Sequence, residues 1–208
     1  MEITKITSHI LQYDMPQTLG YSQQFYDKRT AHLIEVETDE GLTGWGECFG
    51  PGNIALANRT IVQDVIQPMI LGHSPLDRDV LWHKTYNLMR DHGQKGRPMQ
   101  ALSGVDIALW DIAGKVANLP LYQLIGGAHR QHIPVYGYGM MLRPEPLEDL
   151  TVRFKEEARA IKDMGFVATK MKVGLGPRAD IKLAEAVRRG IGDDFRFMVD
   201  ANHCYTTT

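Results

Sequence analysis

Hydrophobic and polar positions near the end of the chain follow a strand–helix–strand pattern. Residues 166–173 and 195–202 each begin with a short apolar run and end in charged or polar side chains. Residues 177–191 between them are long enough for a helix, which a proline opens and a glycine closes. Two such runs joined by a helical crossover are typical of neighbouring parallel strands.

Upstream of this unit, the chain predicts one more strand and one more helix of the same kind. Residues 133–140 are expected to form a first strand, and residues 148–164 a helix that Gly165 ends. Strands that alternate with helices in this way build a parallel sheet. We therefore expect residues 132–208 to be the start of a (β/α) TIM-type barrel.

The N-terminal part has a different order, with strands first and helices after them. Residues 2–13 and 30–38 predict strands, a hairpin turn is expected at 39–41, and residues 42–49 form the returning strand. Residues 17–29 are polar and lack periodicity, so they are expected to form a loop.

Three helices are expected next, over residues 54–70, 76–90 and 98–117. The third has apolar residues at helical spacing, which predicts a stripe that faces the core. This stripe consists of Leu102, Val105, Leu109, Ile112 and Val116. Strands followed by helices make residues 1–131 an α+β domain.

Composition and charge exclude several classes of partner. The net charge is −2 at pH 7, so there is no electrostatic basis for binding nucleic acid or an anionic membrane. The sequence has no run of about 18 apolar residues, so no transmembrane span is expected, and no signal peptide is visible. Cys48 and Cys204 lack zinc-site spacing, which favours free thiols in a reducing cytoplasm.

The candidate chemistry lies where the two C-terminal strands end. Side chains two apart on a strand share a face, so Lys170 and Lys172 point the same way, with Met171 opposite. On the next strand Asp200 and Asn202 share a face. Because this end of the strands holds the active site in parallel α/β barrels, we expect these polar side chains to line one.

Two lysines at this spacing can act as a base and a carboxylate receptor. At about 4 Å apart their charges repel by roughly 4 kcal/mol at an effective dielectric near 20, or about three pKa units. One lysine would then be a usable base near neutral pH, while the other neutralises a substrate carboxylate. With a hard divalent cation on Asp200, these groups suit abstraction of a proton next to a carboxylate. The competing interpretation is a solvated Lys-x-Lys on the surface.

Four motifs occur in an order that resembles a known family. They are Gly-Leu-Thr-Gly-Trp-Gly-Glu at 41–47, the segment 101–115 followed by 121–127, Lys170-Met171-Lys172, and Val199-Asp200-Ala201-Asn202. Together they resemble the mandelate racemase/muconate lactonizing branch of the enolase superfamily. The resemblance implies that Lys172 acts as acid and base on the α-carbon, and that Lys170 contacts the substrate carboxylate and tunes Lys172. It also implies that Asp200 is the first of three carboxylate ligands to Mg²⁺.

The same resemblance makes residues 1–131 a capping domain and residues 17–29 its mobile loop, which closes over the substrate. Polar residues of this loop would hydrogen-bond a small, hydroxylated carboxylate. They are Tyr21, Gln23, Gln24, Tyr26 and Arg29. Asn202 would neighbour the metal or the substrate, and His203 would touch the ligand from the loop above the third strand.

Several outcomes remain open after proton abstraction. Loss of a β-hydroxyl, as in an acid-sugar dehydratase, is favoured by the polar capping loop. Reprotonation on the opposite face would give a racemase or epimerase, and cycloisomerisation comes third. A Schiff base on Lys170 or Lys172, as in barrel aldolases, is a separate alternative that the resemblance disfavours.

The length of the chain bears on each of these hypotheses. A complete eight-unit barrel takes about 250 residues, whereas residues 132–208 suffice for three strands. The family's other two metal ligands would lie on later strands, so we expect the N-terminal part of an enzyme, with a non-catalytic fragment as the alternative. An open barrel would expose its third strand as an edge, so we expect a homo-oligomer or further residues to cover it.

Overall fold

The computed structural model describes residues 1–22, 24–91 and 93–206. The chain divides into two compact units. The first contains Met1–Asp14 and Lys28–His129, and the second contains Met15–Asp27 and the chain from Arg130 onward. The second unit therefore combines the tip of the N-terminal hairpin with the C-terminal part of the chain.

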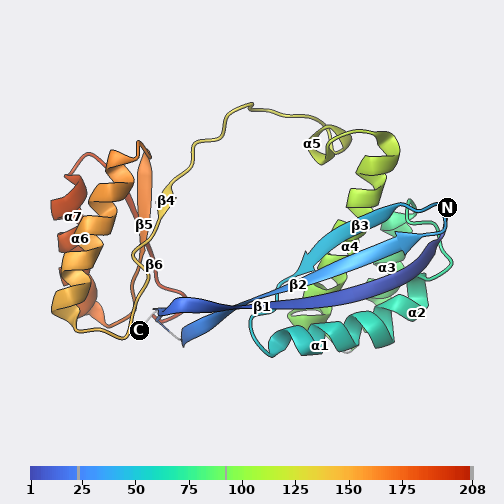
Figure 1. The fold of residues 1–208 in the computed structure, drawn as a ribbon, viewed down its shortest axis with the longest axis horizontal. Helices are drawn as coiled ribbons and strands as arrows, with labels where there is room; N and C mark the ends of the chain where they lie inside the picture. The colour runs from blue at the N-terminus through green and yellow to red at the C-terminus, as the bar shows by residue number, and fades with distance from the viewer. Residues whose placement is uncertain (23, 92, 207–208) are drawn as a thin grey trace. The chain divides into compact units, whose positions relative to one another are not determined.

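A three-stranded sheet begins the chain, in the order β1-β2-β3 (Figure 1). Its strands are β1 (Ile3–Tyr21), β2 (Gln24–Thr38) and β3 (Thr43–Cys48). β2 and β3 are antiparallel, with His32 opposite Cys48 at one end and Glu37 opposite Thr43 at the other. The turn predicted at 39–41 is confirmed, since the Gly41 N–H donates to the Thr38 carbonyl over 3.1 Å.

The loop predicted over residues 17–29 is wrong, because β1 and β2 continue through most of it. Near the hairpin tip, most side chains on both faces are exposed or half-buried. The alternation of apolar and polar residues that marks a half-buried strand therefore disappears, although backbone pairing keeps the segment extended. Gln23, one of the expected ligand-binding residues, lies outside the described residues.

Helices follow the first sheet over the three predicted ranges, although the first range is divided into several helical segments and a short helix after residue 120 was not predicted. They are α1 (Ile54–Thr60), α2 (Gln67–Ile70), α3 (Arg78–Met89), α4 (Arg97–Ala117) and α5 (Leu121–Leu124), with a π-helical turn η1 (Ile61–Ile66) between α1 and α2. Nowhere in the described part of the chain is a helix both long enough and apolar enough to cross a membrane.

α4 and β3 approach each other through glycines. A Cβ atom added at Gly46 would lie 2.0 Å from the carbonyl oxygen of Gly104, and one added at Gly44 would lie 2.1 Å from that of Ala108. Only glycine permits such a close approach between two backbones. The first core of the molecule forms around this contact.

The apolar stripe predicted on α4 is confirmed except at its last position. The buried members are Leu102, Val105, Leu109 and Ile112. Val116 is 45% exposed, so its assignment to the core is wrong. The last turn of α4, residues 115–117, is exposed throughout, and helical spacing alone does not show where the core ends.

The second unit holds a parallel sheet and two helices (Figure 1). Its elements in chain order are β4 (Gly137–Tyr138), α6 (Leu147–Asp163), β5 (Ala168–Lys172), α7 (Pro177–Ile191) and β6 (Arg196–Asp200). The strand order is β4-β5-β6, and both neighbouring pairs are parallel. These are successive β/α units, as expected for the first part of a barrel.

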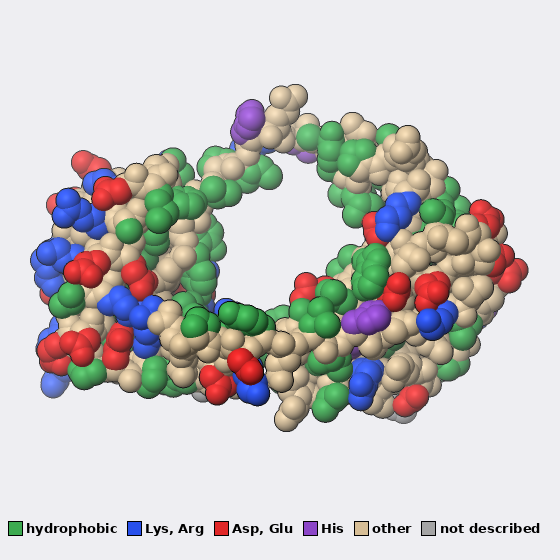
Figure 2. Space-filling view, in the orientation of Figure 1, with side chains coloured by type: hydrophobic (Ala, Val, Ile, Leu, Met, Phe, Trp, Pro, Cys, Tyr) green, Lys and Arg blue, Asp and Glu red, His purple; other side chains and the backbone are tan. Residues whose placement is uncertain are grey.

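The core of this unit lies between the sheet and its helices. Phe154 of α6, Met171 of β5 and Leu183 of α7 are fully buried. Figure 2 shows that Lys, Arg, Asp and Glu side chains alternate on the outer surface of the same unit. α6 and α7 are therefore amphipathic, and burial of their apolar faces holds the strand ends of the sheet in place.

β4 is shorter than the strand predicted at 133–140, because only Gly137 and Tyr138 pair with β5. Ile133 and Val135 are 75% and 62% exposed. The apolar run that predicted a long strand therefore lies largely outside the core. Gly137 and Tyr138 pair with the sheet, and Met140 at the end of the predicted strand is fully buried and accepts a hydrogen bond from the Lys172 N–H over 3.2 Å.

Candidate active site

Four polar side chains meet where β5 and β6 end. The parallel register places Lys172 opposite Asp200. Lys172 Nζ donates to Asp200 Oδ2 over 2.7 Å, and Lys170 Nζ lies 3.3 Å from the same oxygen. Lys172 Nζ also donates to Asn202 Oδ1. The structure thus brings together the residues that the sequence placed at this edge of the sheet.

Lys172 is the most enclosed of these side chains. Its side chain is 8% exposed, against 23% for Lys170 and 28% for Asp200. Met171, between the two lysines, is fully buried in the core on the opposite face of the strand. An ammonium group at this depth needs a partner of opposite charge, which Asp200 supplies.

The expected lowering of a lysine pKa by mutual repulsion is wrong in this arrangement. Burial lowers the pKa of Lys172, but hydrogen bonds to Asp200 and Tyr138 outweigh burial and raise it. The pKa of Lys170 is also raised, by hydrogen bonds to Tyr136 and Asp200. In turn, the hydrogen bond from Lys172 holds the pKa of Asp200 below its usual value. The carboxylate contacts both ammonium groups and offsets their repulsion.

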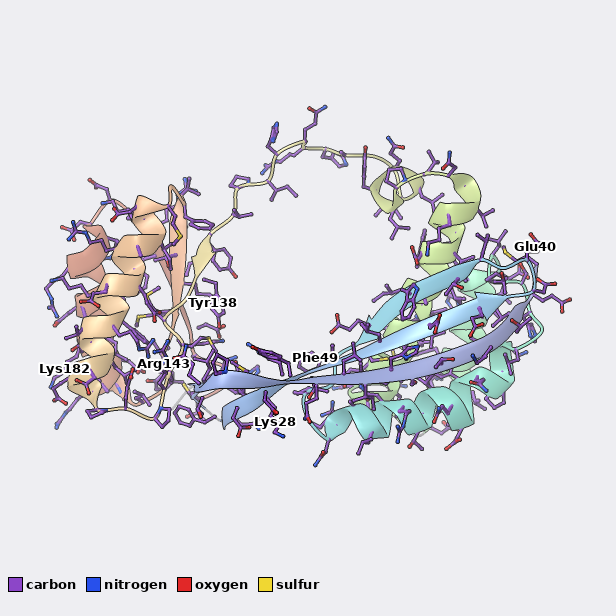
Figure 3. The ribbon with its side chains drawn as sticks, viewed as in Figure 1. Lys28, Glu40, Phe49, Tyr138, Arg143 and Lys182 are labelled. Carbon is purple, nitrogen blue, oxygen red and sulfur yellow. The ribbon has the colours of Figure 1, made fainter. Side chains whose placement is uncertain are left out.

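Two tyrosines that were not predicted from the sequence border the lysines. Lys170 Nζ lies 4.8 Å from the ring centroid of Tyr138 and 5.3 Å from that of Tyr136. Lys172 Nζ lies 5.7 Å from the Tyr138 centroid. Tyr138, labelled in Figure 3, extends from β4 and is paired with Lys170 in the sheet. Tyr138 lies on β4, next to the lysine strand, and Tyr136 lies two residues before it within the segment 133–140 predicted as a strand; that spacing is the signal that would have found them.

The hairpin tip belongs to the same unit and contributes Tyr21 and Ser22. The Tyr21 ring centroid lies 5.9 Å from Lys172 Nζ. Ser22 Oγ donates to the carbonyl of Ala201 over 2.9 Å. Gly20 pairs with Leu142 through two backbone hydrogen bonds of 2.8 and 3.1 Å. Tyr21 is therefore held beside the lysines by the backbone hydrogen bonds of Gly20 on one side and the side-chain hydrogen bond of Ser22 on the other.

His203 and Arg29, which were also predicted to bind the ligand, lie differently. His203 follows Asn202 in the turn after β6, with an exposed side chain and a backbone φ of +66°. Arg29 lies on β2 in the first unit, whereas the lysines belong to the second. The site role of His203 therefore stays a prediction from its position after Asn202, and the geometry of the second unit says nothing of Arg29.

The donor set can be compared with the needs of a hard divalent cation. Asp200 offers carboxylate oxygens and Asn202 offers an amide oxygen beside it, which are ligands that such cations prefer. Within residues 1–22, 24–91 and 93–206, however, no group of three or more His, Cys, Asp or Glu side chains is placed to hold a metal. The chemistry of these oxygens fits magnesium, and Asp200 is the one carboxylate among the four converging side chains.

Alternating strands and helices with charged residues at the strand ends are the features of (β/α) barrel proteins. Residues 6–126 match the N-terminal domain of mandelate racemase/muconate lactonizing enzyme, and residues 153–208 match the enolase C-terminal domain-like family. The chain therefore belongs to the mandelate racemase/muconate lactonizing enzyme family of the enolase superfamily, as the four motifs indicated.

Relatives of known activity carry out several reactions. D-galactarolactone cycloisomerase of Agrobacterium fabrum is 37% identical over 211 residues, which cover 100% of this chain and 53% of that protein. Arabinonate dehydratase of Saccharolobus solfataricus is 35% identical over 173 residues, which cover 83% of this chain and 45% of that protein. This chain thus spans about half the length of the curated relatives it matches.

Solved structures confirm the predicted fold class, an α+β capping domain followed by the first units of a (β/α) barrel. A member of the enolase superfamily from Polaromonas sp. has a TM-score of 0.86 and 38% identity, covering 99% of this chain and 53% of that one. A racemase from Streptomyces coelicolor with bound magnesium has a TM-score of 0.87 and 30% identity, covering 98% of this chain and 56% of that one.

Proposed function

We propose that this chain forms the lysine-bearing part of a magnesium-dependent enzyme that removes the proton α to a carboxylate. The observation that carries the proposal is the convergence of Lys170, Lys172 and Asp200 at the ends of two adjacent strands. Lys172 is assigned as the base, because it is the most enclosed of the three. Lys170 is assigned as the contact for the substrate carboxylate, because its side chain is more exposed.

Each residue would then have one task in the reaction. Asp200 would hold magnesium through its carboxylate, with Asn202 next to it. When bound, magnesium supplies positive charge that stabilises the oxygens of an enediolate. Lys170 would pair with the substrate carboxylate and so orient the α-carbon toward Lys172. Lys172 would accept the α-proton at Nζ as a neutral amine, a form that becomes accessible when Asp200, which holds it as an ammonium here, turns to the metal instead. Tyr138 would keep both lysine side chains in position from the neighbouring strand.

The substrate we propose is a small, hydroxylated carboxylate of the acid-sugar class. Tyr21 at the hairpin tip and Tyr138 on β4 place phenol groups around the lysines, and such hydroxyls can bind the hydroxyls of a sugar acid. Arabinonate dehydratase, a 35% identical relative, acts on an acid sugar by its name. Loss of a β-hydroxyl is therefore our leading outcome.

Cycloisomerisation is a second candidate outcome, and racemisation or epimerisation a third. The 37% identical D-galactarolactone cycloisomerase matches the full length of this chain, which supports cycloisomerisation. A hydrophobic dipeptide epimerase from Enterococcus faecalis is 30% identical over 99% of the chain. All of these outcomes begin with the same proton abstraction, so the role of Lys172 can be tested before the product is known.

The test is exchange of the substrate α-proton with solvent deuterium. The intact protein is incubated with Mg²⁺ and a panel of pentonates, hexonates and D-galactarolactone in D₂O, and NMR follows the α-proton signal. Lys172→Ala should slow exchange at least about 100-fold, since a general base contributes roughly 10²–10⁴-fold. Lys182→Ala, an exposed lysine of α7 labelled in Figure 3, is the matched control and should leave exchange unchanged. Undiminished exchange in Lys172→Ala would remove Lys172 from the mechanism.

A Schiff-base mechanism gives a different result in a second experiment. Borohydride would trap a covalent adduct of a carbonyl substrate on Lys170 or Lys172, and mass spectrometry would locate it. We expect no added mass on either lysine. An adduct on Lys172 that forms together with turnover would replace our proposal with the aldolase-like one.

A further inference from the structure

The turn after β6 has an unusual backbone. Asn202 and His203 both have positive φ angles, of 45° and 66°. Two successive non-glycine residues in this region are disfavoured, and they persist only where the surrounding structure determines them strongly. Asn202 is also the residue that accepts a hydrogen bond from Lys172. The contacts that stabilise this turn therefore also keep Asn202 beside Lys172, the candidate base.

Local hydrogen bonds hold the beginning of the turn. The Asn202 N–H donates to Asp200 Oδ1 over 3.2 Å, and the Cys204 N–H donates to the Ala201 carbonyl over 3.1 Å. Ser22 Oγ of the hairpin tip donates to the carbonyls of Ala201 and Asn202 at 2.9 and 3.4 Å. These hydrogen bonds involve residues up to Cys204. The next residue, Tyr205, has a different partner.

That partner is Asp180, in the first turn of α7. The Tyr205 hydroxyl donates to Asp180 Oδ2. The same carboxylate accepts from the Gly174 N–H at 3.0 and 2.9 Å and from the Leu175 N–H at 3.1 Å. Asp180 is only 8% exposed, and its place at the start of a helix favours a negative charge. The hydrogen bonds that its carboxylate accepts therefore come from two loops, the one that contains Gly174 and Leu175 and the one that contains Tyr205.

Those two loops are the ones that carry the site. Gly174 and Leu175 lie two and three residues after Lys172, and Tyr205 lies shortly after Asp200 and Asn202. A Cβ atom at Gly174 would lie 2.1 Å from Ser22 Cβ and 2.8 Å from Cys204 Sγ, so the loop, the hairpin tip and the turn are in direct contact. Asp180 therefore links the loop after Lys172 to the turn after Asp200 through its hydrogen bonds.

We propose that Asp180 and Tyr205 form a positioning pair, which sets the strained Asn202–His203 turn and thereby places Asn202 against Lys172. Neither residue contacts the reacting groups in this arrangement. The pair acts through the backbone of the two loops, and its effect on catalysis rests on the function proposed above. The placement of the turn itself does not depend on that function, and it can be measured without turnover.

Tyr205→Phe is the decisive variant, because it removes the hydroxyl and keeps the ring. Hydrogen–deuterium exchange of the intact protein, read by mass spectrometry, should become about tenfold faster at residues 173–176 and 201–205, since a hydrogen bond to a charged acceptor is lost. Binding of Mn²⁺ as a probe for the Asp200 oxygens, followed by electron paramagnetic resonance, should weaken about three- to tenfold. Tyr13→Phe, an exposed tyrosine of β1 in the first unit, is the matched control and should change neither quantity.

Asp180→Asn provides the second variant, with Asp149→Asn as its control, since Asp149 is an exposed acid in the first turn of α6. Asp180→Asn should show the same exchange pattern as Tyr205→Phe and a fall in kcat larger than the change in KM. Tyr205→Phe protein with a lower unfolding midpoint, but with local exchange and Mn²⁺ binding equal to the control, would overturn the proposal.

The two proposals fail in different ways. If Lys172→Ala leaves α-proton exchange undiminished, the proposed function is lost, while faster exchange of both loops in Tyr205→Phe would still establish the pair. If both loops keep their protection in Tyr205→Phe and Asp180→Asn, the pair is excluded, whatever Lys172 does.

Discussion

Replacing Gly46 with alanine would test how closely α4 and β3 must pack. The added Cβ would lie 2.0 Å from the carbonyl oxygen of Gly104 and 2.9 Å from the amide nitrogen of Ala108. Both neighbours are backbone atoms, so no change of rotamer can relieve the contact. The strand or the helix must move by about 1 Å to reach ordinary van der Waals separation, and close-packed interiors resist such shifts.

Two effects of opposite sign decide how far Gly46→Ala changes the free energy of unfolding. Alanine restricts the unfolded chain more than glycine, which stabilises a protein by about 0.4–1 kcal/mol where the site accepts it. Overpacking a well-packed core costs about 1–3 kcal/mol and sometimes more. The clash at Gly46 is backed on the helix side by the buried Val105 and Leu109. We therefore expect a net loss of about 2–3 kcal/mol, or roughly 30- to 150-fold in the unfolding equilibrium.

Urea unfolding measured by tryptophan fluorescence is a suitable assay. The three tryptophans of this chain, at positions 45, 82 and 110, all lie in the first unit. Glu47→Ala changes the neighbouring, exposed position of β3 and is the matched control. A Gly46→Ala protein whose free energy of unfolding equals that of the wild type within about 0.5 kcal/mol would refute the close packing of the two backbones.

Three further predictions concern thiols, pH and metal. Burial raises the pKa of the Cys48 thiol to about 12, so a thiol reagent at pH 8 should modify the half-buried Cys204 and spare Cys48, as peptide mass mapping can show. Burial lowers the pKa of His32 in the folded protein from 6.5. Because the unfolded chain then binds a proton on His32 more readily than the folded protein does, the stability linked to His32 is present above about pH 6.5 and is lost as the pH falls. Urea midpoints at pH 7 and pH 5 should therefore differ less in His32→Leu than in the wild type. Removal of divalent cations with EDTA should abolish α-proton exchange and added Mg²⁺ should restore it; exchange that persists without cations would contradict the metal assignment.

Local signals predicted some elements almost to the residue. α7 has the bounds expected from Pro177 and Gly192, because its two ends are marked by residues with fixed backbone preferences. Two apolar runs joined by one helix also predicted that β5 and β6 are parallel neighbours, as the structure has them. Strand alternation then placed the polar side chains of both strands at the same end of the sheet, whereas the pairing of Lys172 with Asp200 comes from the structure.

Features that depend on contacts between residues far apart in the chain could not be predicted from the sequence. The hairpin tip has no apolar alternation, since its strands are stabilised by each other's backbone and not by a buried face. Asp180 in the first turn of α7 and Tyr205 after β6 are 25 positions apart, and no periodicity links them. The raised pKa of Lys172 likewise depends on where Asp200 and Tyr138 lie in space, which residue spacing within β5 does not show.

The charged side chains of the site favour an anionic ligand. Without a metal, the raised pKa of each lysine and the lowered pKa of Asp200 keep all three groups ionised near neutral pH. Two ammonium groups and one carboxylate then leave a net charge of about +1 in a partly buried region, where charge is screened less than at the surface. A magnesium ion on Asp200 would add to this positive charge, and a bound carboxylate would offset part of it. Asn202 contributes to this balance because it is neutral, whereas an aspartate in its place would cancel one positive charge before any substrate arrived.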